Sequence, residues 1–222
     1  MDTRKHLIAA SILSADFSCL AEEIRRAEQA GADWIHCDIT DGHFVENLTM
    51  GTLAVKAARK TTSLPLDVHL MIEHPERFVE LFARCGADCI SVHYETALHL
   101  TRTVQLIRDA GIKPGVALGP SVPVSHLEWI LDDIDYVLIL AVSPGFGGQR
   151  YIPNTMERIR QVSRMIERSG REILIQSDGG INLETVQDFS RAGVNVFTVG
   201  SALFGSDDYA RTIREFHTRI DL

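Results

Sequence analysis

Eight short apolar segments, each followed by a stretch of helical periodicity, recur along this chain, and this alternation constrains its fold more than any other feature. Such alternation predicts parallel strands joined by crossover helices. The strands are expected at Leu7–Ser11, Trp34–Asp38, Leu66–Leu70, Cys89–His93, Pro114–Leu118, Tyr136–Leu140, Ile173–Ser177 and Val196–Val199. Examples of the amphipathic helices are expected at Ala21–Gln29, Pro75–Cys85, Val124–Leu131, Asn154–Glu167 and Leu183–Ala192.

The repeat length favours a closed barrel. Dividing 222 residues by eight leaves about 28 per unit, enough for one strand, one helix and two short loops. The sequence therefore predicts the α/β class, with one (β/α)8 TIM barrel domain over residues 1–222. An open doubly wound sheet is the alternative, but it would place a glycine-rich fingerprint after the first strand. Here that strand leads into Ser14-Ala15-Asp16-Phe17, and the glycines come late.

Three similar turns support this division. Gly31-Ala32-Asp33, Gly86-Ala87-Asp88 and Gly193-Val194-Asn195 each follow a predicted helix and precede a predicted strand. Glycine favours the left-handed conformation that ends many helices. We interpret these turns as structural features of the barrel's N-terminal face rather than as ligand loops.

Charge and composition narrow the functional classes. The net charge is −8, and acidic and basic residues are interleaved, so no basic stripe predicts nucleic-acid binding. The first 17 residues lack the features of a signal sequence, and no later stretch is apolar enough to span a membrane. A cytoplasmic protein without a membrane partner is expected. The cysteines, expected to be reduced and mostly buried, are Cys19, Cys37, Cys85 and Cys89.

Polar residues occupy the C-terminal ends of several predicted strands, which is where barrel enzymes carry their reactive groups. His36 and Asp38 are two residues apart, so both should face inward while Cys37 faces the helices. His69 ends the third strand, and Asp178 follows the seventh. A lone histidine is more often a hydrogen-bonded core residue than a ligand. Together, the two imidazoles and two carboxylates suit zinc, iron(II), manganese or cobalt, with zinc favoured.

Glycine-rich turns follow the last three strands, where many barrels bind phosphate. They are Gly145-Phe146-Gly147-Gly148, Gly179-Gly180 and Gly200-Ser201. Each turn alone is a weak signal, because glycine also marks ordinary loops. Three in succession predict a phosphorylated ligand, since backbone N–H groups can approach an anion without interference from Cβ atoms.

Several separated motifs resemble those of ribulose-phosphate 3-epimerases, in the same order and spacing and over essentially the whole chain. The matching segments are Ser11–Phe17, His36–Asn47, Asp67–Ile72, Pro144–Gln149 and Asp178–Gly180. The resemblance implies a TIM barrel of the ribulose-phosphate-binding type. It also implies an isomerase that converts D-ribulose 5-phosphate to D-xylulose 5-phosphate by inverting C3.

The resemblance assigns roles to individual residues. It implies one divalent metal ion held by His36, Asp38, His69 and Asp178, with Asp38 and Asp178 as the catalytic acid/base pair. Met71 would shield the site. The substrate contacts it implies are Ser11, His69, Gly145, Phe146, Gly147, Gly148, Asp178, Gly179, Gly180, Gly200 and Ser201. Two carboxyl groups suit this chemistry, because one removes the proton next to the carbonyl, giving an enediolate, and the other returns a proton to the opposite face.

The chain departs from the family pattern near the predicted site. Thr40 and Leu140 stand where methionines are usual, and Gly119 stands where asparagine is usual. Fewer methionines suggest a wetter pocket or an altered metal preference. Related epimerases act on other ketose phosphates such as D-allulose 6-phosphate, and this remains the alternative substrate class.

Two other functions are weaker candidates. Decarboxylation on a similar phosphate-binding barrel needs a lysine to protonate a carbanion, and the segment from His36 to Asp41 contains none. A non-catalytic sugar-phosphate-binding barrel would be expected to lose the acid/base pair, and both aspartates are present. The family forms dimers and larger rings, so a homo-oligomer, a dimer or a hexamer, is expected.

The remaining predictions concern loops. Phe146, flanked by glycines, is predicted to be part of a lid over the ligand. Capping or solvent-facing roles on loops and helix starts are expected for His43, His74, His93, His99 and His126, and His43 is close enough to Asp41 to border the pocket.

Overall fold

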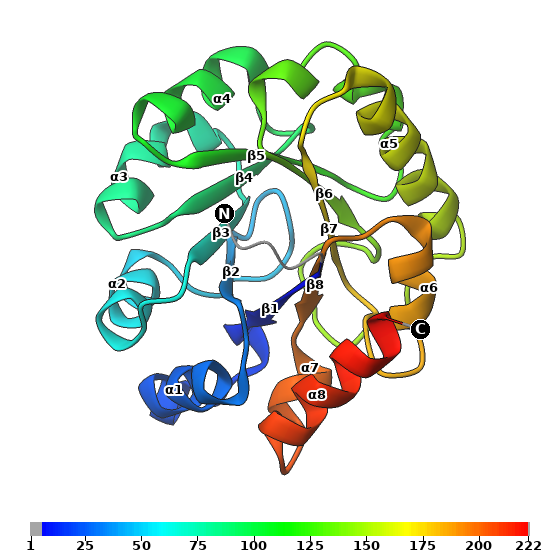
Figure 1. The fold of residues 1–222 in the computed structure, drawn as a ribbon. Coiled ribbons are helices and arrows are strands. Elements are labelled where there is room, and N and C mark those ends of the chain that lie inside the picture. Colours follow the sequence, from blue (N-terminus) through cyan, green and yellow to red (C-terminus); the bar gives the residue numbers. More distant parts are fainter. Residues whose placement is uncertain (1–5, 222) are drawn as a thin grey trace.

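The computed structural model describes residues 6–221, whose eight parallel strands close into a barrel in the order β1 to β8 (Figure 1). The strands are β1 Leu7–Ser11, β2 Trp34–Thr40, β3 Leu66–Met71, β4 Cys89–His93, β5 Lys113–Leu118, β6 Tyr136–Leu140, β7 Leu174–Asp178 and β8 Val196–Val199. The predicted TIM barrel is confirmed, and every predicted strand coincides with an observed one to within two residues. Residues 1–5 and 222 lie outside the described residues. The predicted domain, residues 1–222, includes these positions, and the predicted absence of a signal sequence concerns residues 1–5.

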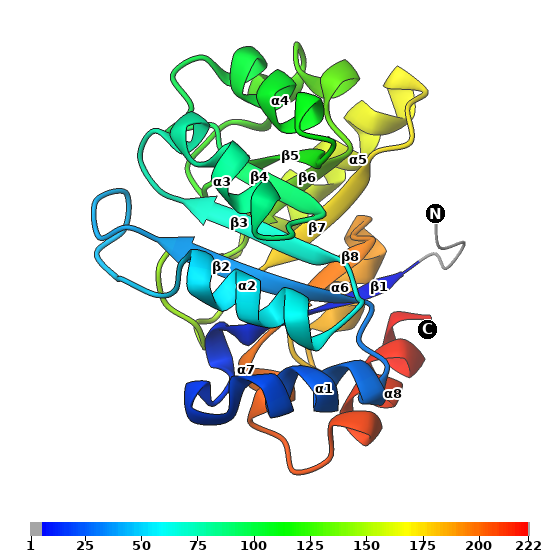
Figure 2. The same ribbon diagram turned by 90° about the vertical axis from the view of Figure 1, so that its left-hand side faces the viewer.

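Helices surround the barrel, as the views along and across its axis show (Figures 1 and 2). The α-helices are α1 Leu20–Ala30, α2 Thr52–Thr61, α3 Val79–Arg84, α4 Leu100–Asp109, α5 Thr155–Ser169, α6 Val186–Ala192, α7 Ser201–Phe204 and α8 Tyr209–Ile220. The 3-10 helices are η1 Ile12–Ser14, η2 Phe17–Cys19, η3 Pro75–Arg77, η4 Val124–Leu127 and η5 Leu131–Asp133. No helix within residues 6–221 has the length and apolar character required to cross a bilayer.

The prediction of an amphipathic α-helix at Val124–Leu131 is wrong. This segment forms η4 and η5 instead, separated by a turn that contains the exposed Trp129. Leu127, Ile130 and Leu131 are buried at helical spacing, which explains the prediction. Backbone hydrogen bonds nevertheless join residues three apart, as from the Ile130 N–H to the Leu127 carbonyl, so the chain winds more tightly than an α-helix.

Side chains on the barrel strands alternate between two environments, because successive residues of a strand point to opposite faces. Ile35, Cys37 and Ile39 of β2 belong to the large apolar core between strands and helices. Burying each isoleucine side chain contributes about 1.5–3 kcal/mol. The prediction that Cys37 faces the helices is confirmed. All four cysteines are free thiols, and Cys19 is the one that is only partly buried.

A separate apolar layer closes the barrel interior at the end where the strands begin. It consists of Leu7, Ala9, Trp34, Cys89, Tyr136 and Val196. Tyr136 is the largest fully buried side chain in this layer, and its ring lies where a Cβ of Gly115 would be. Gly115 therefore makes room for the tyrosine that fills the barrel.

The three predicted structural turns share one hydrogen-bond pattern. The Asp33 carboxylate accepts the Ile8 N–H at 2.8 Å, and the Asp33 N–H donates to the Ile8 carbonyl at 2.9 Å. Asp88 makes the same reciprocal pair with Leu66, and Asn195 with Ile175. The preceding glycines, Gly31, Gly86 and Gly193, have φ of 102°, 101° and 115°. The prediction that these turns are structural is confirmed, because each one caps the start of an earlier strand.

Both ends of the barrel can be followed in Figure 2, where the strand arrowheads point away from the side on which β1 begins and α8 ends. The loops that follow the strands therefore gather at one mouth. The long connection from β2 to α2 lies there, as do the turns after β6, β7 and β8. This arrangement brings the predicted site residues to one end of the barrel.

Replacing Gly115 with alanine is expected to lower the free energy of unfolding by about 1–3 kcal/mol, because the added Cβ would overlap the Tyr136 ring in a closely packed interior. Urea denaturation measures this change. Gly51→Ala is the control, since no heavy atom lies within 4 Å of the added Cβ. Equal stability of the two variants would show that the barrel interior repacks around Gly115 without cost.

Candidate functional site

A cavity of about 130 Å³ opens at the C-terminal ends of the strands. Residues from both predicted parts of the site line it. The predicted site residues that do so are Ser11, Asp38, Met71, Gly145, Phe146, Gly147, Gly148, Asp178, Gly179, Gly180, Gly200 and Ser201. His36 and His69 lie beneath this surface and are fully buried. The structure thus brings the predicted metal cluster and the glycine-rich turns together at one mouth of the barrel.

Four side chains converge at the floor of the cavity. One ligand atom each from His36, Asp38, His69 and Asp178 lies within 4.8 Å of the others. His36 Nε2 and His69 Nδ1 are both 3.1 Å from Asp38 Oδ1, which identifies the ring nitrogen that each histidine turns toward the cluster. The second Asp38 oxygen accepts a hydrogen bond from Ser11 Oγ at 2.8 Å. Asp38 is therefore held at both oxygen atoms.

Asp67 fixes the orientation of His36 from inside the barrel. Its Oδ2 is 2.6 Å from His36 Nδ1 and accepts a hydrogen bond from Gln176 Nε2, also at 2.6 Å. Its Oδ1 accepts the Tyr136 hydroxyl at 3.0 Å. A carboxylate behind a ligating histidine sets the tautomer and ring orientation. We did not predict a role for Asp67, although it lies two residues before His69 and so shares the inward face of β3.

His93 contradicts its expected role as a capping or solvent-facing residue. It ends β4 and is fully buried, with its Nε2 2.9 Å from His69 Nε2. Its Nδ1 is 3.3 Å from Glu95 Oε2, and its ring lies 4.8 Å from that of Phe44. The signal was present in the sequence, because His93 lies at an even spacing from Cys89 and Ser91, which also face inward.

The other histidines outside the cluster lie nearer to expectation. His74 and His99 directly precede η3 and α4. His43 lies in the turn after β2, and its backbone N–H donates to Asp41 Oδ1 at 2.9 Å. His126 lies in η4 and stacks on Tyr94 with ring centroids 4.2 Å apart.

The two aspartates of the cluster have opposite pKa shifts. Burial raises the pKa of Asp38, but the hydrogen bonds and charges of His36 and His69 outweigh this effect and hold the pKa far below its usual range. Burial, together with the nearby Asp38 charge, raises the pKa of Asp178 to about 7. In the metal-free cluster near neutral pH, one carboxyl group is therefore ionised while the other can hold a proton, as a general acid and base pair requires.

The pKa of His36 is raised well above its usual value. Burial alone would lower it, but Asp38 and Asp67 on either side of the ring favour the charged imidazolium. In the cluster without a cation, the positive charge of His36 thus partly offsets two buried carboxylates. A divalent cation would take over this role, and two imidazole nitrogens with two carboxylate oxygens are a donor set that suits a transition metal.

The opposite side of the cavity consists of the glycine-rich turns. Gly179 and Gly180 have φ of 99° and 72°, which favours glycine. A Cβ on Gly179 would lie 2.5 Å from a Val142 methyl carbon, and one on Gly180 would lie 2.6 Å from the Tyr151 backbone nitrogen. The chain at this turn therefore has no room for a side chain, and its backbone forms the wall of the cavity.

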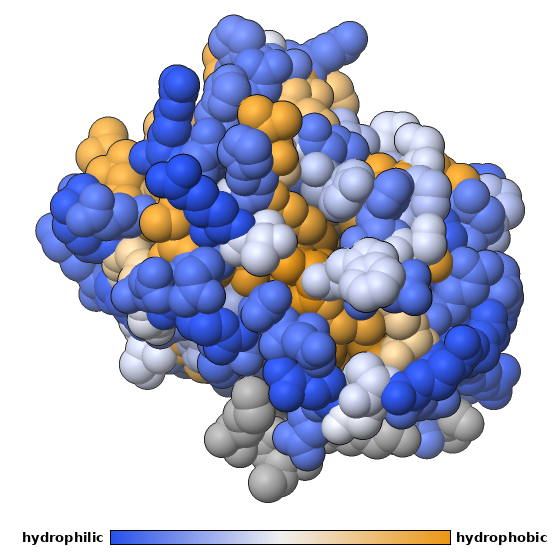
Figure 3. All heavy atoms as spheres, turned by 90° about the horizontal axis from the view of Figure 1, so that it is seen from above, coloured by the Kyte–Doolittle hydropathy of each residue, from blue (hydrophilic) through white to orange (hydrophobic). Residues whose placement is uncertain are grey.

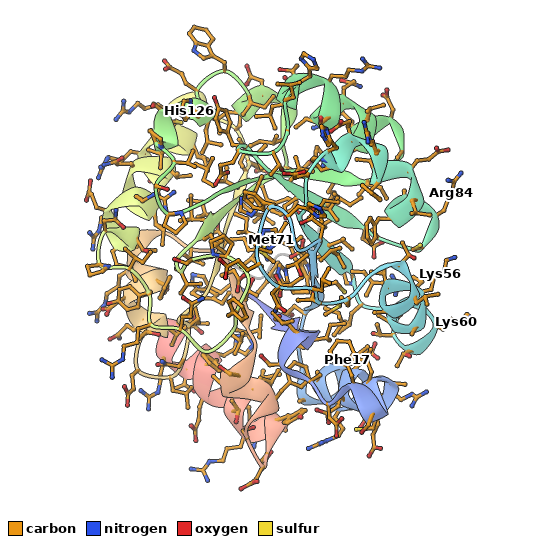
Figure 4. The ribbon with its side chains drawn as sticks, turned by 180° about the vertical axis from the view of Figure 1, so that it is seen from behind. Phe17, Lys56, Lys60, Met71, Arg84 and His126 are labelled. Atoms are coloured by element: carbon orange, nitrogen blue, oxygen red, sulfur yellow. The ribbon has the colours of Figure 1, made fainter. Side chains whose placement is uncertain are left out.

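The positions that depart from the family pattern are accommodated differently. Leu140 is buried and lines the cavity, so it preserves an apolar wall where methionine is usual. The Thr40 hydroxyl lies 3.2 Å from Thr49 Oγ1, which in turn donates to the Asp38 carbonyl at 2.6 Å. Thr40 thus anchors the loop after β2. Figure 4, which looks into the mouth, shows Met71 near the barrel centre.

Comparison with known proteins assigns the family. A match to the ribulose-phosphate 3 epimerase family covers residues 7–204. The chain belongs to this family. Proteins named ribulose-phosphate 3-epimerase are similar over nearly their whole length, with 50% identity for that of Bacillus subtilis (94% of this chain, 96% of the relative) and 41% for that of Escherichia coli (98% and 97%). The prediction from the sequence motifs is confirmed at the level of the family, which is one of epimerases.

Solved structures of more distant proteins share the fold. KGPDC from Streptococcus mutans has a TM-score of 0.75 at 13% identity, with 98% of each chain covered. 3-Hexulose-6-phosphate synthase from Salmonella typhimurium has a TM-score of 0.68 at 17% identity, with 96% of this chain and 98% of that chain covered. At these identities the likeness concerns the barrel alone.

Metal-free protein is expected to lose stability as the pH rises from about 4 to about 7. In this window the folded state keeps a proton on Asp178, whose pKa is raised to about 7, while the unfolded state has released it, so rising pH favours unfolding. The raised pKa of His36 adds to this loss of stability at higher pH. The protonated ring stabilises the folded state fully below the unfolded pKa of histidine, and this stabilisation is lost as the pH rises toward the folded pKa. The Asp178 contribution should be on the order of 4 kcal/mol, because its pKa is raised from 3.8 to about 7.

Denaturant unfolding of chelator-treated protein at a series of pH values measures this effect, with Asp178→Asn as the comparison. The amide does not titrate, so the variant should have a flatter profile between about pH 4 and about pH 7. Identical slopes for the two proteins would mean that Asp178 keeps an ordinary pKa in the fold.

Proposed function

We propose that this chain interconverts D-ribulose 5-phosphate and D-xylulose 5-phosphate by inverting C3. The pair formed by Asp38 and Asp178 carries the proposal. These carboxyl groups border one cavity from β2 and β7, which are separated in the barrel by β1 and β8, and their pKa values are shifted in opposite directions. The names of the relatives agree with this substrate.

Proton transfer follows from the arrangement of the two carboxyl groups. The ionised Asp38 removes the C3 proton from one face of the substrate, and the protonated Asp178 returns a proton to the other face. In the reverse direction the two roles exchange. The hydrogen bond from Ser11 holds Asp38 Oδ2, and His36 and His69 approach Oδ1, so the carboxylate is oriented before substrate arrives.

One divalent metal ion is part of the proposal, with zinc favoured and iron(II), manganese or cobalt as alternatives. His36, Asp38, His69 and Asp178 would hold it. When bound, the ion supplies positive charge next to the oxygen atoms that become negative as the proton leaves C3. Figure 4 shows Lys56, Lys60 and Arg84 at the outer edge of the molecule, away from this point.

The phosphate group would bind at the turns after β6, β7 and β8. The turn after β6 is held to the loop after β2 by a hydrogen bond from Asn47 Nδ2 to the Gly145 carbonyl at 2.9 Å. Phe146 of this turn lines the cavity and is 57% exposed, so its ring has space to move over a bound ligand. We propose that it acts as a lid that excludes water.

Assembly into a homo-oligomer, either a dimer or a hexamer, also remains a proposal. Leu98, before α4, is 81% exposed, and Trp129 is 88% exposed. Figure 3 shows apolar side chains among polar ones on the face seen from above. Contiguous exposed apolar patches mark contact surfaces, whereas single exposed apolar side chains are ordinary. Light scattering measures the mass of the assembly.

Asp38→Asn and Asp178→Asn are each expected to slow epimerisation by about a hundredfold to ten-thousandfold, because each removes one of the two proton-transfer groups. The assay follows exchange of the C3 hydrogen and formation of the epimer in D2O. Residual exchange should affect only the epimer that faces the remaining carboxylate. Metal content is measured on the same samples, since both residues belong to the cluster.

Asp33→Asn is the matched control, because Asp33 is a buried aspartate at the opposite end of the barrel. It should epimerise at the unchanged rate. If ribulose 5-phosphate is inert while D-allulose 6-phosphate exchanges, the mechanism stands and the substrate changes. If neither substrate exchanges with metal-loaded wild-type protein, the proposal is wrong.

Gly180→Ala is expected to weaken substrate binding at least about tenfold, because the Cβ would meet the Tyr151 backbone and shift the turn that receives the phosphate. KM for the ketose phosphate and inhibition by inorganic phosphate measure the change. Gly170→Ala is the control, since Gly170 has a similar φ of 66° but no atom within 4 Å of an added Cβ. Equal KM values for the two variants would place the phosphate elsewhere.

A further inference from the structure

A line of polar groups leads from the buried cluster toward β5 and ends at the partly exposed Glu95 side chain. His69 turns Nδ1 toward Asp38 at 3.1 Å and Nε2 toward His93 Nε2 at 2.9 Å. His93 in turn places Nδ1 3.3 Å from Glu95 Oε2. His69 and His93 are both fully buried, so water does not satisfy these ring nitrogens. The proton-transfer mechanism uses neither His93 nor Glu95.

Hydrogen-bond rules restrict where the hydrogens on this line can lie. A carboxylate only accepts, so Glu95 requires a hydrogen on His93 Nδ1. In the neutral ring, His93 Nε2 is then an acceptor and requires a hydrogen on His69 Nε2. A neutral His69 with its hydrogen on Nε2 has a free lone pair on Nδ1. The Asp38 carboxylate faces Nδ1 and favours a hydrogen there, so Asp38 and Glu95 favour opposite tautomers of His69 in the metal-free protein.

We propose that Glu95, acting through His93, is a positioning residue that selects the His69 tautomer with a free Nδ1 and so raises the metal affinity of the cluster. This inference rests on the proposed metal site. It extends to His69 the principle that a group behind a ligating histidine sets its tautomer. For His36 that group is Asp67, in direct contact, whereas for His69 a second histidine transmits the effect.

Gly119 holds Glu95 in the required place. Its backbone N–H donates to Glu95 Oε1 at 3.1 Å, and its carbonyl accepts Arg158 Nη2 at 2.7 Å. A Cβ at Gly119 would overlap Glu95 Oε1. Asparagine is usual at this position in the family, so the space that Glu95 occupies results from a departure from the family pattern.

Glu95→Gln tests the inference with little change in shape. An amide has one acceptor oxygen. If this oxygen keeps the Gly119 N–H, the NH₂ group faces His93 Nδ1 and requires the opposite tautomer, which transfers a hydrogen to His69 Nδ1. Zinc affinity, measured by competition with a chromophoric chelator, should fall by about 10- to 100-fold.

The tautomer itself provides a readout that needs neither metal nor turnover. Long-range 1H–15N NMR spectra of histidine-labelled, metal-free protein distinguish hydrogen on Nδ1 from hydrogen on Nε2. Wild-type His69 should carry it on Nε2, and Glu95→Gln should carry it on Nδ1. Unchanged His69 signals in the variant would overturn the inference.

Gly119→Ala is the second variant, because it displaces the flexible end of Glu95 without changing its chemistry. It should weaken zinc binding in the same direction. Glu23→Gln is the matched control, since Glu23 is a buried carboxylate that accepts the Tyr209 hydroxyl at 2.8 Å far from the cluster. It should bind zinc as the wild type does. Equal zinc affinity of all three variants would also overturn the inference.

The outcome is separable from that of the proposed function. If wild-type protein fails to epimerise ketose phosphates but Glu95→Gln still shifts the His69 tautomer and loosens zinc, the proposed reaction fails and the inference stands. If the wild type epimerises while neither the tautomer nor the zinc affinity responds to Glu95→Gln, the inference fails alone.

Discussion

The Asp67 carboxylate, buried at the centre of the barrel, is the group on which the site above it depends. It contacts His36 Nδ1 and accepts hydrogen bonds from Tyr136 and Gln176. These partners come from β2, β6 and β7, so one side chain connects distant strands of the closed sheet. Removing it would leave buried donors unsatisfied, at about 1–3 kcal/mol each, and would release the ring that points Nε2 toward the cluster. Fold stability and site geometry thus share one interaction.

Aspartates serve different purposes at the two ends of this barrel. Asp33 and Asp88 accept backbone N–H groups where strands begin, and Asp88 also forms an ion pair with Arg59. Asp38 and Asp178 lie where strands end, close enough for each to alter the protonation of the other. The residue type is the same, but its position along the strand differs. An aspartate beside a strand start caps the backbone, whereas one at a strand end faces the cavity.

Much of the fold could be predicted because alternation of strand and helix is a local property. The strand at Leu7–Ser11 matched at both ends, and the inward direction of His36 and Asp38 followed from their spacing of two. The segment at Val124–Leu131 failed because apolar spacing does not distinguish hydrogen bonds between residues three apart from those between residues four apart. Spacing of this kind reports which side chains are buried, not how tightly the backbone winds.

The supporting residues of the site were harder to foresee. Asp67 and His93 face inward by the same spacing rule, but their roles depend on neighbours that only the register of the strands brings together, such as Tyr136 for Asp67. Glu95 depends on the space left by Gly119, a contact across two strands that no local pattern encodes. The sequence indicated the groups proposed here to do chemistry, whereas the groups that hold them in place required the assembled barrel.

The layer around Tyr136 and Trp34 closes the barrel below the cluster, so the cavity is a blind cup with its opening among the mouth loops. A ligand bound in this cavity must enter and leave through the same opening, so a second ligand cannot bind until the first has dissociated. Substrate and product would therefore share one opening, and the loop that carries Phe146 borders it. Changes to that loop would alter the residence time of substrate and product together, without touching any group that handles a proton.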